Sequence, residues 1–532
     1  MKVWRLESGP IFLLSTLLSL ISILPSCYKI TPMRRYLALI PLVLLFACRT
    51  VSTLPFAVVP GTPTPSLTAS IPPTLTLTPP PSLAAATPTL TLPPLPEAPF
   101  KVVYHPDGGL YAGDRVSFEV IAPEGAIMEG RQAVIEVEGV EGAKFDPAEF
   151  ARFGIAGRVQ ATLFWAWNTS GLPPGNYNLT FTIQPDGVQW TDPVALLPRS
   201  ALPSGEVGAH WVSAQSECCT VYTITGTEAE RDLQMLLDLA DQQAAIVEKA
   251  FKAPFPERAT LVMLPRVLGH GGFANQEISL SYLDRRYSGA DFAIVLRHEL
   301  VHFLDRYLGG ELRPTILVEG LAVYLSGGHF KEEPLLLRAA ALLELGWYQP
   351  MAPLADDFYP SQHEIGYMEA GALVQYMVER WGWEAFSRFY RDIRPGPPGS
   401  GQVEAMDEAL ARHFELTFKE VETGFLETLR QQEVSAETQE DVRMTVAFYD
   451  TVRRYQQALD PSAFYMTAWL PDGKQLREHG IVADLLRHPS APENISLESL
   501  LVSADTHLRA GDYAAVEQLL EAVNKALDAM GS

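Results

Sequence analysis

The chain has 532 residues, of which 47% are hydrophobic and 19% charged, so it can bury more than one core and exceeds an ordinary domain of roughly 100–200 residues. Its 40 basic and 63 acidic residues give a net charge of −23, which argues against a nucleic-acid-binding protein, because such proteins present a basic surface to phosphates. The same balance argues against broad electrostatic adhesion to anionic lipid.

Residues 1–50 are predicted to direct export. The segment MRRYLALIPLVLLFAC, residues 33–48, places two arginines before a long apolar run, and a small residue then precedes a cysteine. This is the three-part layout of a secretory signal. Met33 is therefore a candidate initiator, although the chain has an earlier apolar stretch at residues 11–25. The alternative is that either stretch remains in the mature protein as a short membrane anchor.

The end of this segment resembles a bacterial lipoprotein signal, in which the cysteine is lipidated after cleavage. Cys48 follows the small residue Ala47, whereas Phe46 is bulky for that motif. Cys27, in LPSC, is a second candidate. We therefore expect an exported, extracytoplasmic protein that is anchored to the membrane as a lipoprotein.

Residues 51–99 are predicted to be a disordered stalk. Residues 54–99 hold 14 prolines, many threonines and a single charged residue, Glu97. Such a composition favours an extended, polyproline-like chain and does not supply a packed core. A stalk of this kind would hold the folded part of the protein away from the membrane.

Residues 100–200 are predicted to form an all-β module. Short runs rich in β-branched and aromatic residues, such as VSFEVIA and QATLFWAW, alternate with turns such as PDGG and LPPGNY. Strand-length runs separated by frequent turns favour a β-sandwich. The pattern resembles the immunoglobulin-like modules of bacterial surface proteins. We interpret it as a spacer or binding module, because it shows no catalytic residues.

Cys218 and Cys219 are adjacent in a stretch, CCTVYTIT, that is typical of a strand. Adjacent cysteines rarely bond each other, because the small ring that they would close is strained. We therefore expect two buried thiols. Oxidation, or pairing between two molecules, stays open for an exported protein.

Residues 205–430 are predicted to be an α+β unit that is mainly helical. Residues 227–251 have helical spacing of apolar residues, and Thr227 and Glu230 are placed to form a capping box at the start of that helix. Two strands follow, separated by the glycine-bearing loop LGHGGFANQ, at residues 258–267 and 277–283.

The next predicted helix carries the sequence HELVH. Residues four apart lie on one face of a helix, so His298 and His302 share a face. Two imidazoles in this arrangement can bind one zinc ion, and Glu299 is placed to act on a water molecule at the metal. The alternative is a core helix with two satisfied histidines, because the flanking residues are apolar.

Glu319 is the third ligand candidate. It is the only charge in ILVEGLAVYL, on a second short helix that begins near Pro314 and ends near Gly327. A buried lone carboxylate is costly unless it is paired or bound to a metal, and a catalytic zinc usually takes three protein ligands and one water. The alternative is an ordinary ion pair with Arg313 or Arg297.

HELVH followed by EGLAVYL resembles the gluzincin zinc metallopeptidases, and among them the compact peptidase-MA-like branch, in which a proline-led helix carries EG-x-A-x-Y. The resemblance covers roughly residues 205–430. It implies a zincin-like fold with Zn²⁺ as cofactor. It also implies Glu299 as general base and three zinc ligands, which are His298, His302 and Glu319.

The chain also departs from related patterns. The metzincin motif fails, because Asp305 and Leu308 stand where its glycine and third histidine belong. Thermolysin-like enzymes keep an aspartate four residues after the third ligand to orient a histidine, and Val323 stands there. Another group must then support the ligands, with Asp305 as a candidate. Ile316 replaces the tryptophan that is common in the compact branch.

The resemblance implies hydrolysis of peptide bonds by a zinc-activated water. Zinc polarises the carbonyl and lowers the pKa of its water to about 7, and Glu299 takes the proton and passes it to the leaving amine. A donor for the developing oxyanion is also required. The candidates are Tyr367 and His363, in a helix predicted over residues 363–382, although a core tyrosine and a solvated surface histidine are the alternatives. Gluzincins pair the peptide with an edge strand, here expected at residues 273–282.

Residues 431–532 are predicted to be a helical C-terminal region whose last part, residues 497–530, resembles one tetratricopeptide-like hairpin. The sequence as a whole predicts a zinc metallopeptidase with a peptide or protein substrate, the membrane as a partner and no nucleic acid. The main alternative is a catalytically silent surface scaffold that keeps a metallopeptidase fold. A structural zinc is less consistent, because such sites generally have four protein ligands.

Overall fold

The computed structural model describes residues 93–96, 99–106, 108–140, 145–153, 158–265, 271–282, 285–358, 363–460, 473–487 and 491–530. The chain divides into two compact units, Met1–Pro88 and Thr89–Ser532, and all described residues belong to the second. The predicted export signal, both lipidation candidates and nearly all of the predicted stalk lie outside the described residues. Among the described residues, no helix is long and apolar enough to cross a membrane.

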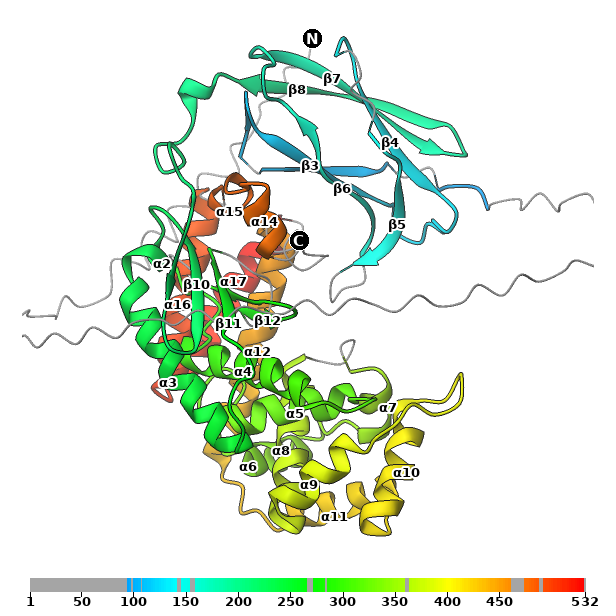
Figure 1. Ribbon diagram of the computed structural model, residues 1–532, viewed down its shortest axis with the longest axis vertical. Coiled ribbons are helices and arrows are strands. Elements are labelled where there is room, and N and C mark those ends of the chain that lie inside the picture. The colour runs from blue at the N-terminus through cyan, green and yellow to red at the C-terminus, as the bar shows by residue number, and fades with distance from the viewer. Residues whose placement is uncertain are drawn as a thin grey trace, which may run out of the picture. The chain divides into compact units, whose positions relative to one another are not determined.

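The N-terminal part of the described chain is a β domain with an eight-stranded sheet (Figure 1). Its strands run in the spatial order β1-β3-β6-β5-β4-β7-β8-β2. They are β1 (Lys101–His105), β2 (Leu110–Tyr111), β3 (Arg115–Ile121), β4 (Gln132–Val137), β5 (Ala148–Phe153), β6 (Arg158–Asn168), β7 (Gly175–Gln184) and β8 (Val188–Leu197).

This sheet is continuous and curled, because β5 pairs with both β4 and β6. Its alternating inward residues form a core whose largest members include Phe118, Trp167 and Phe181, all almost completely buried. The predicted all-β character of this part is confirmed. The immunoglobulin-like sandwich is not confirmed.

A second sheet opens the part of the chain that carries HELVH. Its described strands run in the order β12-β13-β11-β10-β9, with the central pairs β10/β11 and β11/β13 parallel. The strands are β9 (Trp211–Gln215), β10 (Cys219–Ile224), β11 (Ala259–Leu264), β12 (Gly272–Ala274) and β13 (Ile278–Ser281). The two predicted strands are β11 and β13. β12 lies inside the segment that the sequence predicted to be a loop.

The helix predicted over residues 227–251 is broken into two pieces, α2 (Glu228–Arg231) and α3 (Leu233–Phe251). The Thr227 hydroxyl accepts from the backbone N–H of Glu230, as a capping box requires. The Glu230 carboxylate, however, accepts from Gly226 N at 2.7 Å. The predicted capping box is therefore only half formed.

Most of the remaining chain is helical, in agreement with the predicted mainly helical character (Figure 1). The 3₁₀ turn η1 (Arg199–Ala201) stands apart, in the linker before β9. The helices are α4 (Phe292–Leu308), α5 (Thr315–Ser326), α6 (Leu335–Glu344), α7 (Met351–Asp356), α8 (His363–Trp381), α9 (Trp383–Arg391), α10 (Gln402–Phe414), α11 (Phe418–Arg430), α12 (Ala436–Leu459), α14 (Gly473–Glu478), α15 (Ala483–Leu486), α16 (Pro492–Arg509) and α17 (Tyr513–Met530).

One large apolar core joins α3, the second sheet and helices α4 to α11. The predicted second helix is α5: Pro314 is its N-cap, and Gly327, in the left-handed conformation at φ 79°, is its C-cap. At the C-terminal end, α16 and α17 form a hairpin that packs against α12 around Phe448, Tyr455 and Leu501.

Cys218 and Cys219 form a disulfide, so the prediction of two buried thiols is wrong. Successive side chains alternate between the faces of a regular strand, which separates adjacent thiols. Here Cys218 lies in the tight turn between β9 and β10 and Cys219 is the first residue of β10, and Ser216 N donates to Cys219 O at 2.9 Å. The carboxylate of Asp241, on α3, holds this turn by accepting from Cys218 N at 2.8 Å.

Candidate metal centre

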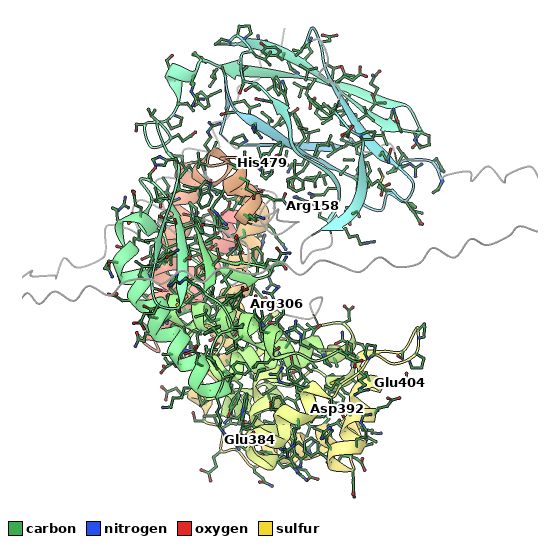
Figure 2. The ribbon with its side chains drawn as sticks, in the orientation of Figure 1. Arg158, Arg306, Glu384, Asp392, Glu404 and His479 are labelled. Carbon is green, nitrogen blue, oxygen red and sulfur yellow. A yellow bond between two sulfur atoms is a disulfide. The ribbon has the colours of Figure 1, made fainter. Side chains whose placement is uncertain are left out.

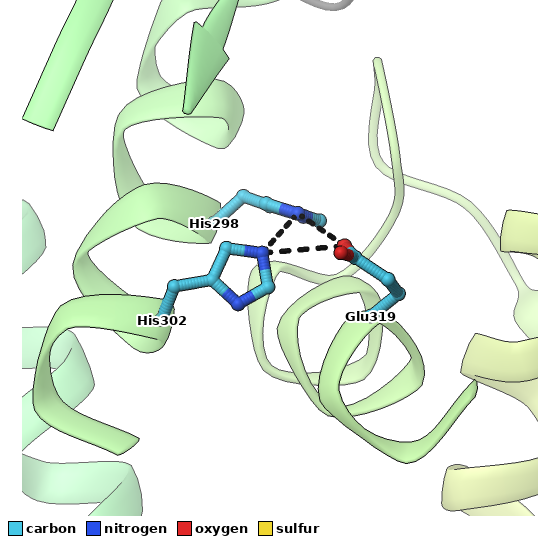
Figure 3. Close-up of side chains that lie close together, drawn as sticks. All are labelled: His298, His302 and Glu319. Carbon is cyan, nitrogen blue, oxygen red and sulfur yellow. Dashed lines mark hydrogen bonds and ion pairs between the residues drawn. The ribbon is translucent and has the colours of Figure 1, made fainter. Parts of the chain in front are cut away.

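The two histidines of HELVH stand one turn apart on α4, and Glu319 faces them from α5 (Figure 3). The N-terminus of α4 is fixed by Asp291, whose carboxylate accepts from the backbone N–H groups of Ala293 and Ile294. A side-chain cap of this kind satisfies N–H groups that would otherwise lack partners and sets where the helix starts. The positions of the histidines on the face of α4 follow from that start.

The Nε2 atoms of His298 and His302 lie 3.0 Å apart. The same two nitrogens lie 3.4 and 3.2 Å from Oε2 of Glu319 (Figure 3). Within the described part of the chain, this is the one group of three or more His, Cys, Asp or Glu side chains whose ligand atoms all lie within 4.8 Å of one another.

These distances suit a tetrahedral metal ion. Zinc bonds of about 2.0–2.1 Å at tetrahedral angles place neighbouring ligand atoms about 3.3 Å apart, and the three distances here are 3.0, 3.2 and 3.4 Å. Two imidazoles and one carboxylate are also a ligand set that zinc accepts, and three protein ligands leave one position for water. The residues present therefore fit zinc.

The triad is almost buried, and its charges are strongly coupled. Burial lowers the pKa of His298 to about 4. Burial would also lower the pKa of His302, but the carboxylate of Glu319 outweighs it and raises this pKa to about 9. Burial opposes the charge of Glu319, yet the two histidines hold the pKa of that carboxyl well below its usual range. Without a metal, Glu319 is therefore ionised near neutral pH and the imidazole of His302 is protonated.

Glu299 lies beside the triad with 4% of its surface exposed. Burial raises the pKa of its carboxyl to about 8, and its Oε2 is buried without a hydrogen-bond partner. A Cβ atom added at Gly272, in β12, would lie 2.9 Å from Cγ and Oε1 of Glu299. The general base predicted from the sequence is thus a desolvated carboxyl pressed against the end of the second sheet.

The two arginines that the alternative would pair with Glu319 bond to other residues. Arg313 donates to Asp305 at 3.0 Å, and Arg297 donates to Gln243 at 2.8 Å. The oxygens of Asp305 also accept from Tyr390 and Arg391. Asp305 was the candidate that the sequence offered for orienting a histidine. Its three donors, Arg313, Tyr390 and Arg391, instead link α4 to the neighbouring segments. Its charge nevertheless contributes to the raised pKa of His302.

Tyr367 lies on α8, and its ring centroid is 6.2 Å from that of His298. His363 is the first residue of the same helix, and its side chain is not among those described. The sequence did not single out His329, in the turn after α5, or Glu364, on α8. His329 Nδ1 lies 3.1 Å from Glu364 Oε2, and both side chains are buried. The scarcity of histidine, 11 in 532 residues, is the one signal that marks His329.

No family model matches the sequence, and no curated protein matches it. Among solved structures, the chain is similar to an aminopeptidase N family protein from Idiomarina loihiensis, with 10% sequence identity and a TM-score of 0.28. The match covers 64% of this chain and 78% of that protein. A similarity at this level identifies neither family nor activity.

Proposed function

We propose that this chain is a zinc-dependent peptidase in which His298, His302 and Glu319 hold the metal. The observation that carries the proposal is the spacing of the three ligand atoms, 3.0 to 3.4 Å, with the buried carboxyl of Glu299 beside them. When bound, zinc would polarise a peptide carbonyl and acidify a water molecule. The gluzincin resemblance of the HELVH and EGLAVYL segments supports the same reading.

Glu299 is the proposed general base. A general base works best when its pKa lies near the operating pH, and burial moves the pKa of Glu299 to about 8. A cation in the triad would favour the carboxylate, because an opposite charge nearby stabilises the ionised form. The unpartnered Oε2 is then the acceptor for a proton of the attacking water, and the same oxygen can hand this proton to the leaving amine.

The proposed peptide-binding element is β12. The sequence pointed to residues 273–282, but β13 within that range is paired on both sides, whereas β12 forms the edge of the described sheet on that side. An extended peptide can add to such an edge through backbone hydrogen bonds. Because Gly272 lies against Glu299, a peptide on this edge would run past the general base.

The test measures zinc and cleavage in the same preparations of the full chain. Zinc is quantified by mass spectrometry, and cleavage is followed with a mixed peptide library for the wild type, Glu299→Gln and Glu404→Gln. Glu404, an exposed residue of α10 (Figure 2), is the matched control. We expect one zinc per chain in all three proteins, with cleavage reduced at least about 10²-fold in Glu299→Gln only.

The outcomes separate the proposal from its alternatives. Wild-type protein that holds zinc but cleaves no peptide favours the catalytically silent scaffold. Cleavage that survives in Glu299→Gln removes Glu299 from the reaction. A wild-type chain that binds no zinc contradicts the metal centre and the peptidase together.

A further inference from the structure

The turn after α5 carries a buried imidazole that the proposed mechanism does not yet use. His329 is 2% exposed, and its ring centroid lies 5.8 Å from that of His298. Its ring is stacked on Tyr367, with centroids 4.0 Å apart and planes inclined by 6°. An imidazole therefore stands beside the metal centre in a fixed plane.

Glu364 determines which nitrogen of His329 carries hydrogen. Its Oε2 lies 3.1 Å from Nδ1 of His329, and Glu364 is 1% exposed. Burial favours an overall neutral pair, which holds either a carboxylic acid with a neutral imidazole or a carboxylate with an imidazolium. In both forms the proton shared with Nδ1 leaves a hydrogen on Nε2.

The turn itself is anchored on three sides. Asp291 N, at the start of α4, donates to Phe330 O at 2.8 Å. His329 N donates to Glu333 at 3.3 Å, and Lys331 bonds to Asp441 of α12 at 3.0 Å. A hydrogen-bond donor held this rigidly in a dry site costs little reorganisation when charge develops next to it.

We propose that His329 is the oxyanion-binding residue of this site: its Nε2–H donates to the carbonyl oxygen of the scissile peptide as the carbon becomes tetrahedral. Glu364 is then a positioning residue that keeps the hydrogen on Nε2, and Tyr367 is a positioning residue that fixes the ring plane. This assignment rests on the proposed peptidase function. It gives the donor role, for which the sequence suggested Tyr367 or His363, to a residue that the sequence did not single out.

The experiment compares two replacements of similar size. His329→Leu removes the donor, whereas His329→Gln keeps an amide N–H that can donate. We expect His329→Leu to lower kcat about 10²–10³-fold, with KM and zinc content unchanged, and His329→Gln to recover a large part of this loss. The exposed His479 (Figure 2) gives the control His479→Leu, expected to behave as wild type.

A tetrahedral inhibitor provides the readout that a packing role would not change. A phosphinic peptide mimics the tetrahedral intermediate, so its affinity should fall in His329→Leu in parallel with kcat/KM, while the affinity for the uncleaved peptide stays constant.

Equal losses in the Leu and Gln variants, or wild-type activity in both, would overturn the assignment. Loss of zinc or of folding in both would also overturn it, because His329 would then be structural. If the wild type itself cleaves no peptide, the result contradicts the proposed peptidase function, whatever the His329 variants do.

Discussion

At the scale of single residues, the charge of Glu319 governs the state of both histidines. Burial alone would keep both imidazoles neutral, and this is the outcome for His298, with a pKa of about 4. Glu319 raises the pKa of His302 to about 9. Near neutral pH the His302 imidazole of the metal-free triad is therefore protonated, and this proton lies among the atoms that would bind a metal. Metal ligands must be deprotonated, so metal uptake has to expel this proton.

We therefore expect zinc uptake at pH 7 to release protons in a countable way. His302 loses one, and Glu299, whose pKa is about 8, loses a second when the cation favours its carboxylate. Zinc affinity should then rise with pH from 7 to about 9 and level off above, once His302 is already neutral. Calorimetry in buffers of different ionisation enthalpy counts the protons.

Glu299→Gln is the control for this count, because glutamine does not titrate. It should release about one proton where the wild type releases about two. A variant that binds zinc at pH 7 without releasing any proton would show that His302 is not protonated in the metal-free triad.

The sequence located part of this site from local spacing alone. The i, i+4 spacing of HELVH placed two histidines on one helix face, and the isolated charge of Glu319 marked a second helix that meets the first. His329 and Glu364 meet only when the turn after α5 folds against the first turn of α8. No spacing along the chain signals that contact, so the sequence could not predict it.

At the scale of elements, the position of Glu319 depends on how closely α5 approaches α8. A Cβ atom at Gly320 would lie 2.8 Å from the carbonyl carbon of Ala370, and one at Gly371 would lie 2.5 Å from Cγ1 of Val323. The two glycines let the helix backbones approach more closely than other residues allow. The close packing of α5 against α8 thus explains why a glycine follows the glutamate in EGLAVYL.

Gly320→Ala should therefore destabilise the protein. Alanine favours a helix over glycine by about 1 kcal/mol, but overpacking typically costs about 1–3 kcal/mol, and the obstacle here is backbone. We expect a lower thermal midpoint for the metal-free protein and weaker zinc binding, because α5 must shift Glu319 as it moves away from α8.

Gly205→Ala is the comparison for this substitution, since an added Cβ at Gly205 meets nothing within 4 Å. Unfolding is followed by circular dichroism without zinc, and zinc affinity is measured separately. Unchanged stability in Gly320→Ala would contradict the close contact between α5 and α8.

Helix boundaries were predicted best where a specific signal marks them. α5 (Thr315–Ser326) agrees closely with the helix expected from its proline and glycine boundaries, and α8 (His363–Trp381) agrees with the helix that the gluzincin resemblance implies. β12 was missed because Gly272–Ala274 is three residues long and shows no alternation that distinguishes a strand from a loop. The split between α2 and α3 was missed for a similar reason, because apolar spacing continues across Asp232.

At the scale of the whole molecule, the net charge of −23 bears on how the protein reaches a membrane. Such a charge opposes adhesion to anionic lipid. We propose that the chain is exported and held at the membrane through a lipidated cysteine. The support is the layout of residues 33–48, which places a basic pair and an apolar run before Cys48.

This proposal predicts that Cys48→Ser abolishes incorporation of a labelled fatty acid and moves the protein from the membrane fraction to the soluble fraction. Cys27→Ser, at the second candidate, should leave both unchanged. Neither change should affect the folded part, because residues 54–99, with 14 prolines, lie between it and the anchor in the sequence. The zinc content of both variants should therefore match that of the wild type. If Cys27→Ser removes the label instead, the earlier apolar stretch is the functional signal. Label that persists in both variants would show that lipid is attached elsewhere and would contradict a lipoprotein signal at residues 33–48.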